Sequence, residues 1–323
     1  MLRPILITLL LSCTLSLAAG GAQARTVTAK IARVSTAVAT LERVSVQLTW
    51  PRDAPQGQLR LRAERVEAPE LGYRFRDLDW HCPLRRDGQG GWRCDGALRS
   101  GRGAPLQLSV ALGTATTDAA LRRGPARIGL HRSAAVPDVT RIDLTQVPLA
   151  WTQALLSQAW SAASITGGRL DSELAITAPP GQPLRIAGPL HLTDAAFDTA
   201  DGSIAAEGLG AKLTIDAQLG DNDSVLVDGA LHGGELLFGR TYISLQQRVV
   251  ALQVEANRKG MQPWQLPSIS WNDPGILSVV GSVALGPAAG VDSLAPRGRL
   301  ALVTDETVAR LHLPAGISSE RRT

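Results

Sequence analysis

The side chains that could carry catalysis are scattered along the chain. The five histidines are His81, His131, His191, His232 and His312, and none of them belongs to an HExxH motif or to a closely spaced ligand pair. No Gly-x-Ser-x-Gly sequence presents a serine nucleophile on a strand-to-helix turn. We therefore expect no enzyme activity, no cofactor and no bound metal.

Two acidic groups resemble metal sites only superficially. Asp221 and Asp223 flank an asparagine as in a calcium loop, but no glutamate follows to complete the ligand set. Asp194, Asp198 and Asp201 are spaced too widely for a known metal motif. A polar hairpin turn and a loop are the interpretations that these two groups favour.

Cysteine chemistry is the clearest signal. Cys82 and Cys94 each follow a tryptophan by two residues, and a turn-rich stretch over 85–91 separates them. The pattern predicts two adjacent strands with the cysteines opposite one another and joined by a disulfide in an oxidising compartment. A metal site that includes His81 is a weaker interpretation, because no second ligand cluster is available.

The amino terminus has the three parts of a secretory signal peptide. Arg3 supplies the early charge, an apolar run follows from Pro4, and small residues precede a cleavage position after Ala24. The run is shorter than the ~20 residues that cross a bilayer. Lipoprotein processing at Cys13 is an alternative. We expect export of a chain without residues 1–24 to the periplasm or cell envelope, where nucleic acid is not a partner.

Charge is unevenly distributed. Residues 25–135 hold 19 basic and 10 acidic side chains, whereas residues 136–323 hold 13 and 19. A basic amino-terminal half could contact a membrane surface with anionic headgroups. A solvated strand face is an equally good interpretation.

Hydrophobic periodicity predicts a mainly β protein. Between Leu209 and Leu219, aliphatic residues and alanine alternate with Lys212, Thr214, Asp216 and Gln218. Period-two alternation places one apolar and one polar face on a long strand. Shorter runs over 59–64 and 106–112 alternate in the same way.

One segment has helical spacing instead. We predict a short amphipathic helix near residues 149–160, where Pro148 is tolerated just before the first turn. Trp151 and Trp160 could pack on the sheet or, alternatively, anchor at a membrane surface. The helix lies in a junction, residues 144–166, between β-regions at 25–143 and 167–323.

Glycines recur in the predicted strands, each followed two residues later by an aliphatic side chain. The recurrent positions are Gly96, Gly188, Gly229 and Gly281. Their separations are too irregular for a repeat of fixed period. They favour a long curved sheet in which glycine permits bends and bulges.

Several of these features resemble AsmA-like envelope proteins, and in particular the YdbH-type branch. The likeness rests on the helix followed by the sequence GGRLDSEL at 167–174, on strands such as RIAGPLHL at 185–192, and on the tryptophan–cysteine hairpin. Membership as a short or diverged member would imply a twisted β-groove, apolar inside, that carries phospholipid between membranes.

An alternating sheet needs something to cover its apolar face. The cover is either lipid in an open groove or a second sheet in a β-sandwich. For the groove, the expected lining residues are Leu213, Ile215, Val225, Val227, Ile243 and Leu245. We expect a lipid-handling protein whose partners are phospholipid or a membrane surface. The alternative is a non-catalytic sandwich that binds other envelope proteins, such as those of a secretion machine.

Overall fold

The computed structural model describes residues 24–35, 39–52, 54–88, 90–260, 262, 264–287, 294–303 and 317–320. The expected signal peptide up to residue 23, the alternative lipoprotein site at Cys13, and His312 lie outside these residues. The first strand begins at Ala24.

Twenty strands of the described chain belong to one sheet. Those before the helical junction are β1 (Ala24–Ser35), β2 (Thr40–Pro51), β3 (Gln56–Ala68), β4 (Tyr73–Arg86), β5 (Trp92–Ser100), β6 (Leu106–Leu112), β7 (Thr116–Arg123), β8 (Ala126–Ser133) and β9 (Val139–Pro148). Those after it are β10 (Ala163–Thr177), β11 (Leu184–Thr199), β12 (Ile204–Leu219), β13 (Asn222–His232), β14 (Glu235–Phe238), β15 (Thr241–Ser244), β16 (Val249–Lys259), β17 (Gln265–Asp273), β18 (Leu277–Pro287), β19 (Leu294–Val303) and β20 (Ile317–Glu320).

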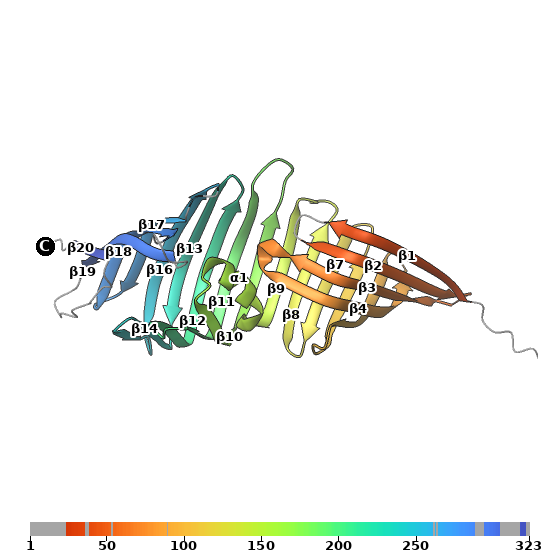
Figure 1. Cartoon of the computed structure of the whole chain (residues 1–323), viewed down its shortest axis with the longest axis horizontal. Helices are drawn as coiled ribbons and strands as arrows, with labels where there is room; N and C mark the ends of the chain where they lie inside the picture. Colours follow the sequence, from red (N-terminus) through yellow and green to blue (C-terminus); the bar gives the residue numbers. More distant parts are fainter. Residues whose placement is uncertain are drawn as a thin grey trace, which may run out of the picture.

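Sequential neighbours pair antiparallel along almost the whole sheet. The order runs from β1 to β13, continues with β16 beside β13, and ends with β19 and a short parallel β20. The β14–β15 hairpin pairs with the first residues of β12. Figure 1 shows the resulting elongated, open sheet. The prediction of a long antiparallel sheet is confirmed. The sandwich alternative is wrong, because the described strands form a single sheet.

The predicted helix is present as one turn of 3-10 helix, η2 (Leu149–Thr152), followed by α1 (Gln153–Ala159). It packs on the protein itself. The Trp160 and Phe197 rings meet edge to face at 5.9 Å. The Arg123 guanidinium lies 5.4 Å from the centre of the Trp151 ring. Tyr73, just after the short η1 (Pro69–Leu71), donates a hydrogen bond to the Trp151 carbonyl. Because β9 and β10 pair with each other, the sheet continues across the junction.

The two faces of the sheet differ as the alternation predicts. Along β12, Leu209, Ala211 and Ala217 are buried, whereas Lys212 and Gln218 are exposed. Residues directly opposite on antiparallel strands point to the same face. The strand register therefore carries the apolar face of β12 to its neighbours on both sides.

The sheet is strongly curved at its amino-terminal end, with its apolar face inside. In a flat sheet β2 and β5 would lie about 14 Å apart, three strand spacings of ~4.8 Å. The Trp50 and Trp92 rings, from these two strands, instead meet edge to face at 5.8 Å. The Trp80 indole on β4 donates to the Leu108 carbonyl on β6 over 3.3 Å. Strands β1–β4 accordingly cross in front of β7 and β8 in Figure 1.

Farther along the sheet, β11 and β13 each require glycine at one position. Gly188 and Gly229 have φ values of +152° and +149°, which side chains rarely adopt. At each, an added Cβ would lie 2.2 Å from a carbonyl oxygen of the preceding strand, that of Glu173 or Lys212. Both glycines are among the recurrent positions, and at each one the backbone conformation and the close neighbouring strand require glycine.

Two compact cores close parts of the apolar face. The carboxy-terminal core comprises Ala195, Ala206, Leu209, Ala211, Leu231, Leu245 and Val250, and Leu149 of the helical segment packs against it. The smaller amino-terminal core contains Trp80 and both cysteines. The helix and the β14–β15 hairpin thus cover one part of the sheet, and the curled strands cover another.

The predicted disulfide is confirmed between Cys82 and Cys94, whose Cα atoms are 5.4 Å apart. The predicted register is off by two residues, because Cys94 lies opposite Leu84. The cysteines are therefore diagonal neighbours. Gly96 makes room for them, since an added Cβ there would lie 2.6 Å from the Cβ of Cys82.

Replacing Gly229 with alanine should destabilise the protein by about 2–3 kcal/mol. The φ at this position is strained for alanine, and the alanine Cβ would clash with the Lys212 carbonyl. Gly88→Ala is the matched control, since nothing lies within 4 Å of its added Cβ. Urea unfolding midpoints measure both. Equal midpoints for the two variants would show that position 229 does not need glycine.

Thiol labelling of the unreduced protein should find neither Cys82 nor Cys94 free. Reduction should lower the unfolding free energy by about 3 kcal/mol, because the bond closes a loop of roughly a dozen residues. A C82S/C94S variant should show the same loss and no further response to reductant. Two labelled thiols before reduction would refute the assignment.

Candidate functional site

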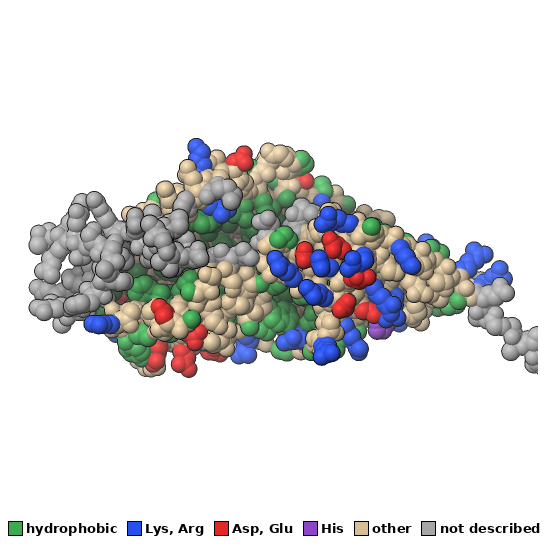
Figure 2. All heavy atoms as spheres, in the orientation of Figure 1, with side chains coloured by type: hydrophobic (Ala, Val, Ile, Leu, Met, Phe, Trp, Pro, Cys, Tyr) green, Lys and Arg blue, Asp and Glu red, His purple; other side chains and the backbone are tan. Residues whose placement is uncertain are grey.

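The apolar face forms a long trough whose middle is only half covered. A central apolar row crosses the sheet from β5 to β18 through directly opposed residues: Gly96, Leu108, Leu121, Ile128, Leu144, Ser172, Leu190, Leu213, Gly229, Leu252, Trp271 and Val279. Its leucine, isoleucine, valine and tryptophan members are all half-buried. Figure 2 shows hydrophobic side chains gathered in the hollow along the middle of the molecule.

The single polar side chain in the central apolar row has its hydrogen bond satisfied. Ser172 is buried, and its hydroxyl donates to the Pro189 carbonyl at 2.6 Å. A buried hydroxyl with a partner costs little to keep out of water. The row therefore presents an effectively apolar surface across β10.

Four of the six predicted lining residues lie together on the trough wall. Ile215 and Val227 are directly opposite each other on β12 and β13. Leu213 and Val225 lie two residues from them on the same face, and all four are half-buried. Val254 on β16 lies opposite Val227 and extends this second apolar row, which runs beside the central one.

The other two predicted lining residues lie elsewhere. Ile243 is in β15 and packs against the carboxy-terminal core. Leu245, just after β15, is completely buried within that core, with 0% exposure. Both residues therefore belong to the hairpin that covers the trough, and neither lines the trough wall.

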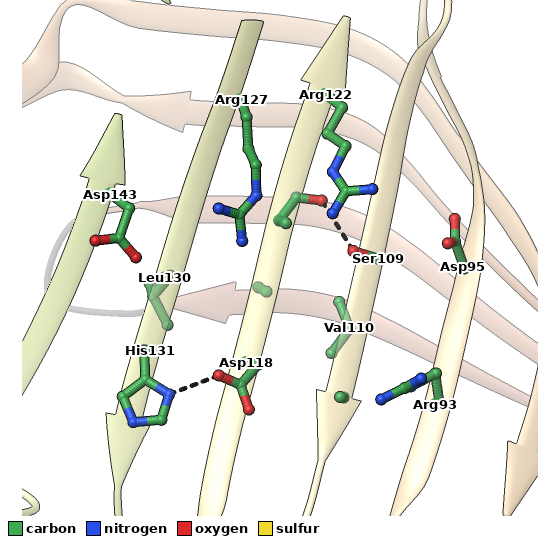
Figure 3. A pocket seen from close by; sticks show the side chains of 13 residues that line it. Arg93, Asp95, Ser109, Val110, Asp118, Arg122, Arg127, Leu130, His131 and Asp143 are labelled. Atoms are coloured by element: carbon green, nitrogen blue, oxygen red, sulfur yellow. Dashed lines mark hydrogen bonds and ion pairs between the residues drawn. The ribbon is translucent and has the colours of Figure 1, made fainter. Parts of the chain in front are cut away.

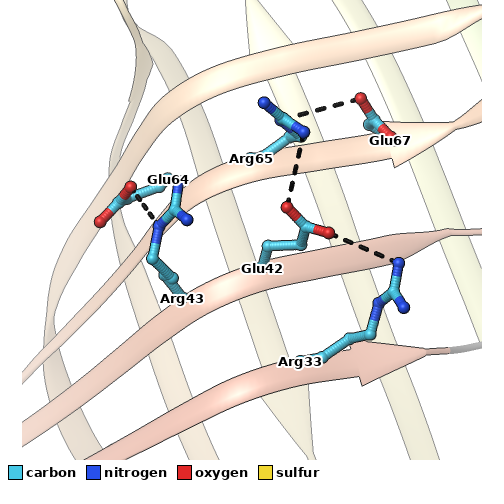
Figure 4. Close-up of polar contacts among 6 residues, drawn as sticks. All are labelled: Arg33, Glu42, Arg43, Glu64, Arg65 and Glu67. Atoms are coloured by element: carbon cyan, nitrogen blue, oxygen red, sulfur yellow. Dashed lines mark hydrogen bonds and ion pairs between the residues drawn. The ribbon is translucent and has the colours of Figure 1, made fainter.

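The opposite face of the curled amino-terminal strands is charged. Glu42 lies between Arg33 at 3.4 Å and Arg65 at 3.6 Å, and Arg43 pairs with Glu64. Figure 4 shows these side chains projecting from β1–β3 away from the strands behind them. Exposed pairs of this kind contribute ~0–1 kcal/mol each. The arginine side chains in these pairs are exposed, at 65% for Arg33 and 61% for Arg43.

Paired acids on this polar face titrate low. Arg60 hydrogen-bonds Asp79 and lowers the pKa of that carboxyl below its usual value, with a further contribution from Arg62. Arg185 does the same to the pKa of Asp216 on β12 through two hydrogen bonds. The side chains of Asp79 and Asp216 are partly exposed to solvent. Solvent screens these ion pairs, so they contribute little to the free energy of unfolding and mainly position side chains.

The acidic groups that resemble metal ligands have structural partners. The Thr199 hydroxyl and Ser203 bond to Asp201 in the β11–β12 turn and lower the pKa of its carboxyl to about 2. Asp223 is buried and pairs with Arg258 while accepting from the Gly220 amide. In the part of the chain that the structure describes, no group of three or more His, Cys, Asp or Glu side chains could hold a metal.

Two structural features are not predicted by the sequence. The first is the β14–β15 hairpin, which covers the carboxy-terminal core. Its apolar run, which includes Leu236 and Leu237, is too short to indicate a strand. The helical segment also contacts Tyr73 on β4 and Arg123 on β7. These contacts join residues that are distant in sequence, and no local pattern marks them.

Comparison with protein-family models, with curated proteins and with solved structures found no match to this chain. Among the described residues, no helix is long and apolar enough to cross a membrane. The trough itself is therefore the observation from which a function must be argued.

Replacing Ile215 with aspartate should lower the unfolding free energy by about 1–3 kcal/mol, because it places a charge without a partner on the half-buried apolar wall. Gln218→Asp is the matched control, since this exposed position on the same strand lies opposite Arg185 and should be nearly neutral. Chemical denaturation compares the two. Equal losses would contradict the assignment of faces.

Proposed function

We propose that the protein is a non-catalytic, lipid-handling component of the cell envelope that holds acyl chains in its apolar trough. The observation that carries the proposal is the central apolar row, which runs from β5 to β18 and whose leucine, isoleucine, valine and tryptophan side chains are all half-buried. A second sheet would bury such a row fully, as in a sandwich core. An apolar ligand of extended shape is the filler that the geometry favours.

The chemistry of the trough supports lipid as that ligand. Each methylene removed from water contributes about 0.8 kcal/mol, so an acyl chain laid along the row is held without any directional contact. The wall at Ile215, Val227 and Val254 offers branched aliphatic side chains and no charge. Contiguous apolar surface that stays accessible is typical of interaction sites and ligand-binding grooves.

The same features support an envelope location and the resemblance to AsmA-like, YdbH-type proteins as proposals. The disulfide is compatible with an oxidising compartment such as the periplasm. An open, curved sheet with an apolar inner face is the form that the resemblance implies. Phospholipid or a membrane surface is then the proposed partner.

A second candidate function is the assembly of the chain with another envelope protein. Strand β1 lies at the edge of the sheet, and no described strand pairs with its outer side. Its trough-facing Val27 and Ile31 are 64% and 41% exposed. Exposed edges accept an added strand from a partner. A partner strand with alternating apolar residues would extend the trough.

A photo-crosslinking amino acid at Val227 should capture phospholipid in intact cells, because this side chain lies on the trough wall. Leu226 is the matched control: it is the preceding aliphatic residue, lies on the opposite face and is 40% exposed. Mass spectrometry of the crosslinked species is the measurement. Lipid captured equally at both positions, or only protein captured at Val227, would count against the proposal.

A further inference from the structure

A second concave site lies on the outer face of the sheet, opposite the trough. Strands β5–β9 form a pocket there of about 310 Å³, near the lower end of the range for small-ligand sites. Figure 3 shows charged side chains surrounding it, among them Arg93, Arg122, Arg127 and Asp143. The predicted lipid site on the other face does not use these residues.

Small side chains form the floor of the pocket. Ser109, Ala120 and Gly129 are opposed in register on β6, β7 and β8. Gly129 has no unusual φ to explain its choice. An added Cβ there would lie 3.3 Å from a terminal nitrogen of Arg127, so the glycine makes room for the guanidinium to lie across the floor.

The two arginines at one end lack an acidic partner. Arg122 and Arg127 are directly opposite each other on β7 and β8, an arrangement in which like charges repel. Within the described ranges, neither forms an ion pair. The Nε of Arg127 is buried and has no hydrogen-bond partner there. A buried unsatisfied donor is costly and rare in native proteins.

The acidic side chains around the pocket differ in whether they have hydrogen-bond partners. Asp118 is bonded to His131 at 2.6 Å and to Thr116 at 3.2 Å, and Asp95 accepts from Gln107. Asp143, opposite Gly129, has no polar partner among the residues that the structure describes. The pocket therefore offers two unpaired guanidiniums and one unpaired carboxylate.

We propose that this outer-face pocket binds a small zwitterionic phosphate ligand. Its oxyanion would bridge Arg122 and Arg127, because guanidinium groups bind phosphate through paired, charge-assisted hydrogen bonds. Its cationic group would lie toward Asp143. Such a phosphate–ammonium pair occurs both in soluble phosphoethanolamine and in the headgroup of phosphatidylethanolamine. The proposal is independent of lipid in the trough.

The test is calorimetric titration of the mature protein with phosphoethanolamine and with inorganic phosphate. Wild type should bind phosphoethanolamine, and R122Q or R127Q should weaken binding about tenfold or more, as expected for losing a hydrogen bond between charged groups. G129V should weaken it as well, by displacing the Arg127 guanidinium. D143N should weaken phosphoethanolamine but leave inorganic phosphate unchanged.

R141Q is the matched control, because Arg141 lies on the same face beside His131 but does not line the pocket. It should bind like wild type. Thermal unfolding checks that each variant is folded, and exposed Arg122 is the safest position to replace. No binding by folded wild type, or an equal loss in R141Q and R122Q, would overturn the proposal.

Flotation with phosphatidylethanolamine vesicles separates the two ligand sources. Because the trough can itself contact lipid, the comparison is between wild type and R122Q, both of which keep the trough intact. Flotation that falls in R122Q assigns the pocket to a lipid headgroup. Flotation that is unchanged, together with tight binding of soluble phosphoethanolamine, assigns it to a free phosphate ester.

Discussion

A single sheet with one apolar face cannot bury that face by itself, and this constraint governs the rest of the molecule. The chain covers its apolar surface in two places. At one, the amino-terminal strands curl until Trp50 meets Trp92; at the other, the helical segment and the β14–β15 hairpin close over a core that includes Leu245. Between them, the central apolar row stays half-buried. Hydrophobic free energy is thus left unrealised along the middle of the protein, where a ligand can recover it.

Curvature at the amino-terminal end makes the apolar surface concave, and at a few other positions the sheet requires glycine. Gly188 and Gly229 adopt φ values closed to other residues and approach the carbonyl oxygens of the preceding strands. Gly96 plays a related part at the disulfide, where a missing Cβ admits the diagonal Cys82–Cys94 bond. Gly188 and Gly229 lie within the apolar rows, opposite Ile215 and Leu213.

The two faces of the sheet provide separate chemistry. The trough is lined by side chains without charge, whereas the outer face carries paired surface ions over β1–β3 and an unpaired arginine couple, Arg122 and Arg127, over β7 and β8. Because side chains alternate between faces, neighbouring residues such as Leu121 and Arg122 serve different sites. A substitution can therefore affect one face without changing the other.

Local patterns in the sequence were sufficient for the mainly β fold, the helix near 149–160, the disulfide pair and the apolar side of β12, because alternation, helical spacing and cysteine placement act over a few residues. They were also sufficient to place Leu213, Ile215, Val225 and Val227 on one face. Only the tertiary structure decided that the face stays open and that Leu245 lies in a closed core. Only it brought Arg122 opposite Arg127, with Gly129 leaving room for the Arg127 guanidinium. These outcomes depend on strand register and on contacts between distant segments such as Tyr73 and Trp151, and no local pattern specifies either.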